Sequence, residues 1–162
     1  MDTGVTAPRR ALHVLVVDDF EDTAESLALL LRYDGHQTDF AQSGSAALAI
    51  ARARPPDVAL LDIVMPDLSG YEVARELRTL LGQGVLLVAI TVLESEEDKA
   101  RGREAGFDVY FTKPADLRRL RALVREVAAW RARFTRGEGL GVAAPNGASD
   151  ILSKSNRKKS IN

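Results

Sequence analysis

The chain lacks several features that would place it in a special class of protein. It has no cysteine, which excludes disulfide bonds and thiolate metal sites and agrees with a reducing compartment. Its longest apolar runs, such as Val85–Ile90, are far shorter than the roughly 20 residues of a membrane-spanning helix. The first ten residues, MDTGVTAPRR, lack the apolar core of a signal peptide. We therefore expect a soluble, cytoplasmic protein with no membrane segment.

The net charge is close to zero but unevenly distributed. The 162 residues together carry −1, which argues against wholesale binding to nucleic acid or membranes. From residue 135 onward, five Lys and Arg stand against two acids (net +3), whereas residues 1–134 hold 17 Lys and Arg against 21 acids (net −4). The basic end is rich in Gly, Ala, Ser and Asn, with few large apolar residues. We expect an N-terminal extension (1–10), one folded domain (11–134) and a flexible, disordered tail (135–162) that is too short for a DNA-binding domain.

Five short apolar runs alternate with segments of helical periodicity. Most of the runs are rich in Val, Ile and Leu, which is typical of strands covered on both faces, and the second run is weaker: Leu12–Val17, Gln37–Ala41, Val58–Leu61, Val85–Ile90 and Asp108–Phe111. The helical segments are Glu21–Tyr33, Ser45–Arg54, Ser69–Leu81, a stretch from a Ser95–Asp98 capping box to Gly106, and Asp116–Phe134. Strict alternation predicts an α/β fold, a doubly wound five-stranded parallel sheet with helices on both faces.

Polar residues follow four of these strands. Asp18 and Asp19 follow the first strand, Asp62 the third, Thr91 the fourth, and Lys113, before Pro114, the fifth. Because the carboxyl ends of parallel strands meet at one edge of a sheet, where such folds bind ligands, we expect these side chains to converge there.

Each of these residues also has a plain explanation by itself. The paired acids could cap the first helix, Asp62 could end a turn, Thr91 could be a strand residue, and Lys113 could be a solvated loop residue. Together, three close carboxylates repel each other unless a proton or cation compensates them. Carboxylates with water are the ligands that Mg²⁺ prefers. Such a site suits phosphoryl transfer, with an aspartyl phosphate formed on Asp62.

Four stretches of the chain carry a family resemblance. VLVVDDFED, PPDVALLDIVMPDLSGYEVARELR, VAIT and VYFTKP resemble the receiver domains of bacterial response regulators, the CheY-like family of two-component signalling, which has a flavodoxin-like (βα)₅ fold. The resemblance covers roughly Ala11 to Phe134. It implies a Mg²⁺ cofactor and a single-domain response regulator that is not an enzyme acting on external substrates.

The resemblance also assigns roles to individual residues. Asp62 would be the phosphoacceptor, and Mg²⁺ would be held by Asp19, by Asp18 largely through water, by Asp62 and by the Val64 backbone carbonyl. Thr91 would be the switch hydroxyl, Tyr110 the switch aromatic and Lys113 the partner of the phosphoryl group, before a cis peptide bond to Pro114.

The resemblance further implies partners. A histidine kinase or a histidine phosphotransfer protein would donate the phosphoryl group. The face formed by the fourth helix, the fifth strand and the last helix would then change and control an unknown target protein, or form a homodimer. The fourth helix, ESEEDKARGRE, is unusually polar, so it is either simply solvated or packed marginally enough to move.

Two alternative functions, each from a different class of protein, remain open on the sequence alone. One is an interaction module that does not use phosphorylation; the intact set of acids, threonine and lysine argues against it. The other is an aspartyl-phosphate hydrolase, which usually has a second acid two residues after the nucleophile, where this chain has Val64. Val64, Leu93 and Val92 (where the family usually has Ala or Gly) suggest restricted access of water, and hence a long-lived phosphorylated state.

Overall fold

The computed structural model of the chain describes residues 10–135. Five parallel strands form one sheet in the order β2-β1-β3-β4-β5: β1 (His13–Val17), β2 (Gln37–Ala41), β3 (Val58–Leu61), β4 (Leu86–Thr91) and β5 (Val109–Thr112). The helices are α1 (Glu21–Tyr33), α2 (Gly44–Ala53), α3 (Gly70–Leu81), α4 (Glu96–Ala105) and α5 (Leu117–Thr135), with a short 3₁₀ turn η1 (Gly82–Gly84). The predicted α/β fold is confirmed. The predicted extension and tail lie outside the described residues, except for Arg10 and Thr135.

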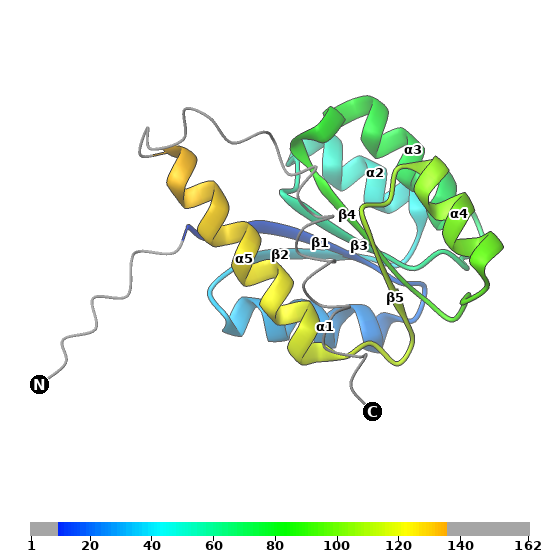
Figure 1. Ribbon diagram of the computed structural model, residues 1–162, viewed down its shortest axis with the longest axis horizontal. Helices are drawn as coiled ribbons and strands as arrows, with labels where there is room; N and C mark the ends of the chain where they lie inside the picture. Colours follow the sequence, from blue (N-terminus) through cyan, green and yellow to red (C-terminus); the bar gives the residue numbers. More distant parts are fainter. Residues whose placement is uncertain (1–9, 136–162) are drawn as a thin grey trace, which may run out of the picture.

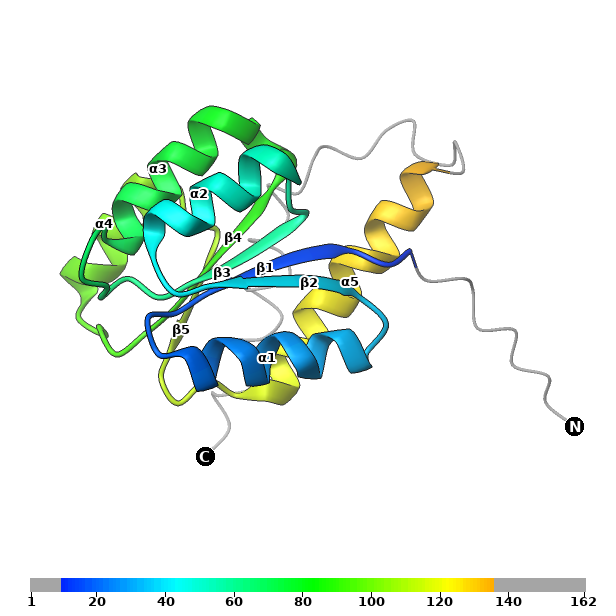
Figure 2. The same ribbon diagram turned by 180° about the vertical axis from the view of Figure 1, so that it is seen from behind.

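The sheet lies between two layers of helices. Helices α1 and α5 cover one face, and α2, α3 and α4 cover the other (Figures 1 and 2). Alternate residues of β1 enter the two cores: Leu15 and Val17 pack with α2 and α3, whereas Val14 and Val16 pack with α1 and α5. Both faces of β1 are buried, which explains why four of its five residues are apolar in succession instead of alternating with polar ones.

Several element boundaries differ from the predicted ones by one residue. Helix α2 begins at Gly44 because the Ser43 side chain caps it, accepting a hydrogen bond from the N–H of Ala46. Thr91, predicted to follow the fourth strand, is its last residue because it pairs with Thr112 of β5. The predicted capping box of Ser95 and Asp98 is confirmed at the start of α4.

Helix α4 has little apolar surface to bury. Its buried residues are Gly102 and Ala105, and Gly106 ends the helix in the left-handed region at φ 108°. The hydrophobic contribution to its attachment is therefore small compared with α3, which buries Tyr71, Val73 and Leu77. Among the described residues, no helix is both long enough and apolar enough to cross a membrane.

Candidate functional site

Strand β1 ends at two adjacent carboxylates. Asp18 is buried at 5% exposure, whereas Asp19 is exposed. The backbone N–H of Phe20 donates to Oδ1 of Asp18 at 2.9 Å. The alternative that this pair caps α1 is not supported, because Phe20 occupies the N-cap position and no side chain makes a capping hydrogen bond there. The two acids thus contribute little to starting the helix.

Strand β3 leads into a third, buried carboxylate. Asp62 is 7% exposed, and the N–H of Val64 donates to its Oδ1 at 3.2 Å. The backbone N–H of Asp62 donates to the carbonyl of Val17 at 2.9 Å, which ties it to the strand that carries Asp18. The first residue of α3, Gly70, lies so close that an added Cβ would be 2.3 Å from the Asp62 carbonyl oxygen. The backbone around Asp62 is therefore packed tightly on both sides.

Lys113 bridges the two buried carboxylates. Its Nζ lies 2.7 Å from Oδ2 of Asp18 and 2.9 Å from Oδ2 of Asp62. Burial acts to lower the pKa of the ammonium, but the hydrogen bonds to Asp18 and Asp62 outweigh it and hold the pKa above its usual value. The lysine is therefore charged at neutral pH. The peptide bond to Pro114 is cis, as the sequence suggested.

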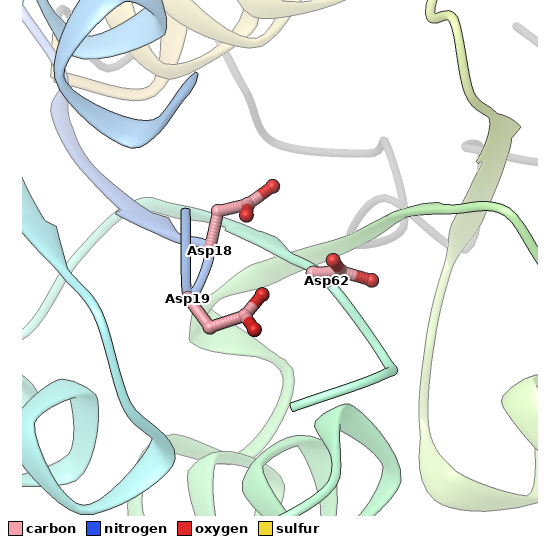
Figure 3. Close-up of side chains that lie close together, drawn as sticks. All are labelled: Asp18, Asp19 and Asp62. Atoms are coloured by element: carbon pink, nitrogen blue, oxygen red, sulfur yellow. The ribbon is translucent and has the colours of Figure 1, made fainter. Parts of the chain in front are cut away.

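The three carboxylates form a cluster that suits a hard divalent cation. Oxygen atoms of Asp18, Asp19 and Asp62 lie within 4.8 Å of one another. Figure 3 shows the three side chains extending from the ends of β1 and β3 toward a common space. One ammonium balances only part of their charge, and oxygen donors at this spacing are what Mg²⁺ takes from proteins. The residues present therefore fit the metal that the sequence predicted.

The two predicted switch residues lie in the neighbouring strands β4 and β5, close to the start of α4. Thr91 is fully buried, and its Oγ1 accepts a hydrogen bond from the N–H of Leu93 at 3.4 Å. The Tyr110 hydroxyl donates to the carbonyl of the same Leu93 at 2.9 Å. Tyr110 is half-buried, and burial together with the neighbouring Tyr71 raises the pKa of its hydroxyl. The backbone of Leu93 thus contacts both switch residues.

Two contributors were missed by the sequence analysis. The hydroxyl of Tyr71 in α3 donates to the carbonyl of Asp98 in α4. The sequence around Tyr71, SGYE, did not indicate that this hydroxyl would make a hydrogen bond. Asp67 closes the loop after Asp62: it accepts hydrogen bonds from the N–H groups of Gly44 and Ser45 and from the Ser45 hydroxyl. This role of Asp67 could have been predicted only if the packing of its loop against the start of α2 were known.

The comparisons with known proteins agree with this geometry. Residues 14–125 match the response regulator receiver domain family. A probable transcriptional regulatory protein, TcrX of Mycobacterium tuberculosis, is 42% identical over 116 residues, which are 69% of this chain and 49% of that protein. The response regulator MprA of Mycolicibacterium vanbaalenii is 36% identical over 140 residues, 86% of this chain and 59% of that protein. The chain spans about half the length of the curated relatives it matches.

Solved receiver structures have the same fold. A CheY-like receiver domain protein from Methanospirillum hungatei superposes with a TM-score of 0.70 at 25% identity, covering 76% of this chain and 98% of that one. A response regulator described as putative, from Chloroflexus aurantiacus, superposes with a TM-score of 0.67 at 30% identity, covering 74% of this chain and 99% of that one. The chain therefore belongs to the family of response regulator receiver domains.

Proposed function

We propose that the protein accepts a phosphoryl group on Asp62 from a histidine kinase or a histidine phosphotransfer protein, in a Mg²⁺-dependent reaction. The observation that carries the proposal is the Lys113 ammonium, which bridges Asp18 and Asp62 within a cluster of three carboxylates. Phosphoryl transfer requires mainly positioning and charge neutralisation, which this arrangement of side chains supplies.

Asp62 acts as the nucleophile in this reaction. One carboxylate oxygen forms a bond to phosphorus while the bond between phosphorus and the donor's imidazole nitrogen breaks; the nitrogen keeps the electron pair and takes a proton from water. Lys113, already 2.9 Å from Oδ2, neutralises charge on the transferred group. Asp18, Asp19, Asp62 and the Val64 carbonyl would hold a Mg²⁺ ion, which would supply further positive charge to the phosphoryl oxygens.

The effect of phosphorylation reaches the surface of the domain through the backbone of Leu93. Phosphorylation adds nearly two negative charges and three acceptor oxygens beside Thr91. When the Thr91 hydroxyl turns to donate to them, its contact with the N–H of Leu93 is lost, and the Leu93 carbonyl is the acceptor of Tyr110. The face of α4, β5 and α5 then changes its equilibrium between two arrangements, and a target protein that distinguishes them reads the signal.

Intact-mass measurement tests the proposal. Wild-type protein incubated with Mg²⁺ and acetyl phosphate is expected to gain one phosphoryl group. The variant Asp62→Asn and wild type in EDTA are expected to gain none, because the nucleophile or the metal is missing. Asp22→Asn, which changes an exposed acid of α1, is the matched control and is expected to label like wild type. Equal labelling of wild type and Asp62→Asn, or no labelling by any small donor or kinase, would contradict the proposal and favour an interaction module independent of phosphorylation.

A further inference from the structure

The attachment of α4 to the rest of the domain requires an explanation other than apolar burial. Its side chains are mostly charged, and its buried residues are Gly102 and Ala105, which have almost no apolar surface to bury. The helix nevertheless packs against α3 (Figure 1), and its Gly102 meets the Tyr110 ring of β5. Polar contacts must therefore provide much of its attachment.

Two tyrosine hydroxyls beneath α4 supply these contacts. Tyr71 of α3, which is 3% exposed, donates to the carbonyl of Asp98 in the first turn of α4 at 3.2 Å. Tyr110 of β5 donates to the carbonyl of Leu93, just before α4, at 2.9 Å. The two phenol groups lie close enough for each to affect the pKa of the other, and burial raises the pKa of both. The hydroxyls thus connect the start of α4 to α3 on one side and to β5 on the other.

The rings of the same tyrosines shape the underside of the helix. The guanidinium of Arg101 lies over the Tyr71 ring, 4.6 Å from its centroid, as in a cation–π contact. At Gly102, an added Cβ would be only 3.3 Å from the Tyr110 ring. Helix α4 therefore rests on both rings, and its position fits one arrangement of the two side chains.

We propose that Tyr71 is a positioning residue of the switch: its hydroxyl ties the first turn of α4 to α3 and thereby holds α4 over the Tyr110 ring. A movement of Tyr110 breaks its hydrogen bond to Leu93 and removes the ring that Gly102 contacts, and a displacement of α4 breaks the hydrogen bond from Tyr71 to Asp98, so the two movements are coupled through the start of α4. The inference deepens the proposed function, because it assigns to Tyr71 the link between the phosphoryl site and the α4 surface. Its test nevertheless begins with unphosphorylated protein.

Hydrogen exchange of the α4 amides in the full chain measures the effect. In Tyr71→Phe, which keeps the ring and removes the hydroxyl, we expect roughly fivefold faster exchange across α4, the effect of one lost neutral hydrogen bond. Tyr33→Phe is the matched control: Tyr33 is 86% exposed on α1, and its loss is expected to leave α4 unchanged. Exchange in Tyr71→Phe equal to that in Tyr33→Phe would overturn the inference.

A double-mutant cycle separates coupling from simple loss of stability. Tyr110→Phe is also expected to speed α4 exchange, and Tyr71→Phe combined with Tyr110→Phe is expected to add less than the sum of the two logarithmic effects. Gly102→Ala probes the contact between α4 and Tyr110 from the helix side, because the added methyl group presses on the Tyr110 ring. Its effect should shrink in Tyr71→Phe, where α4 is freer to move away from that ring. If the logarithmic effects on exchange were strictly additive in both double variants, Tyr71→Phe with Tyr110→Phe and Tyr71→Phe with Gly102→Ala, the proposed coupling would be contradicted.

The response to a phosphoryl analogue provides a readout that a merely structural tyrosine would not alter. With Mg²⁺ and beryllofluoride, wild type is expected to change its α4 exchange, and Tyr71→Phe is expected to show a change at least threefold smaller, because α4 is already released. A response of wild-type size in Tyr71→Phe would overturn the inference. Absence of any response in wild type would count against the proposed function instead, and the cycle on unphosphorylated protein would still decide the role of Tyr71.

Discussion

At the scale of single residues, the site depends on a balance between acids and one lysine. Two carboxylates with exposures of 5% and 7% lie beside each other because Lys113 donates to both. The exposed Asp19 adds a third negative charge that the lysine does not reach by any hydrogen bond within the described part of the chain. The excess negative charge makes the cluster receptive to a divalent cation, which would in turn compensate the charge of an incoming phosphoryl group.

The apolar side chains beside the site predict a slow loss of the phosphoryl group. Val64 is 52% exposed at the edge of the site and Leu93 is half-buried, so neither orients a water molecule by a hydrogen bond. The double variant Val64→Asn/Leu93→Glu is expected to lose phosphate roughly tenfold faster, the effect of one well-placed hydrogen bond in the transition state. Phosphate release after removal of the donor measures the rate, with Leu80→Asn as a distant exposed control. An unchanged rate would count against the role of these two side chains.

Gly70 is the residue whose replacement should most directly displace Asp62. The Cβ of Gly70→Ala would meet backbone atoms of Asp62 and Ile63 at 2.3 and 2.6 Å, and backbone cannot give way as a side-chain end can. We expect a loss of about 2–3 kcal/mol in the free energy of unfolding, together with slower phosphorylation. Urea unfolding and intact mass measure both effects. The control Gly84→Ala, whose Cβ meets nothing within 4 Å, should affect neither, and equal behaviour of the two variants would refute the close contact.

At the scale of elements, the loop between β3 and α3 is held to the start of α2 by the carboxylate of Asp67, which lies in the loop. Hydrogen bonds from the side chain and backbone of Ser45 hold the pKa of Asp67 far below its usual value of 3.8. Because the folded-state pKa is lower than the unfolded one, this contribution to stability is fully present above about pH 4 and is lost as the pH falls toward the folded-state pKa.

The lowered pKa of Asp67 predicts a pH dependence of the free energy of unfolding that Asp67→Asn should remove. The free energy of unfolding of wild type is expected to fall more steeply below pH 4 than that of Asp67→Asn, which cannot titrate at this position. Urea unfolding at several pH values between 7 and 2.5 measures the two curves. Parallel curves over the whole range would show that the Asp67 contact adds nothing in acid.

The elements also show how far the sequence could predict this protein. Continuous runs such as Val58–Leu61 identified the strands, because burial on both faces leaves no polar position, and the strand ends then brought Asp18, Asp62 and Lys113 to one edge. The tyrosine pair under α4 could not be predicted, because the contact of Tyr71 with Asp98 depends on how two helices pack. The same holds for Asp67, whose partners lie 22 and 23 residues away at the start of α2.

At the scale of the whole molecule, metal binding should be visible as added stability. A ligand that binds only the folded state stabilises it by about 1.4 kcal/mol when its free concentration is about ten times its dissociation constant. We expect Mg²⁺ to raise the melting temperature of wild type and to have a much smaller effect on Asp19→Asn. Asp19 is the suitable position because it is exposed and its removal leaves the Lys113 bridge intact. Equal stabilisation of both proteins would place the metal elsewhere.

Phosphorylation of Asp62 can be tested by locating the modified residue in the phosphorylated protein. Reduction of the phosphorylated protein with borohydride converts an acyl phosphate to an alcohol, so the modified aspartate becomes homoserine and can be found by peptide sequencing in a mass spectrometer. We expect homoserine at position 62, formed only when both Mg²⁺ and the phosphodonor are present. Homoserine at position 18 or 19 instead, or at no aspartate of a protein that has gained a phosphoryl group, would contradict it.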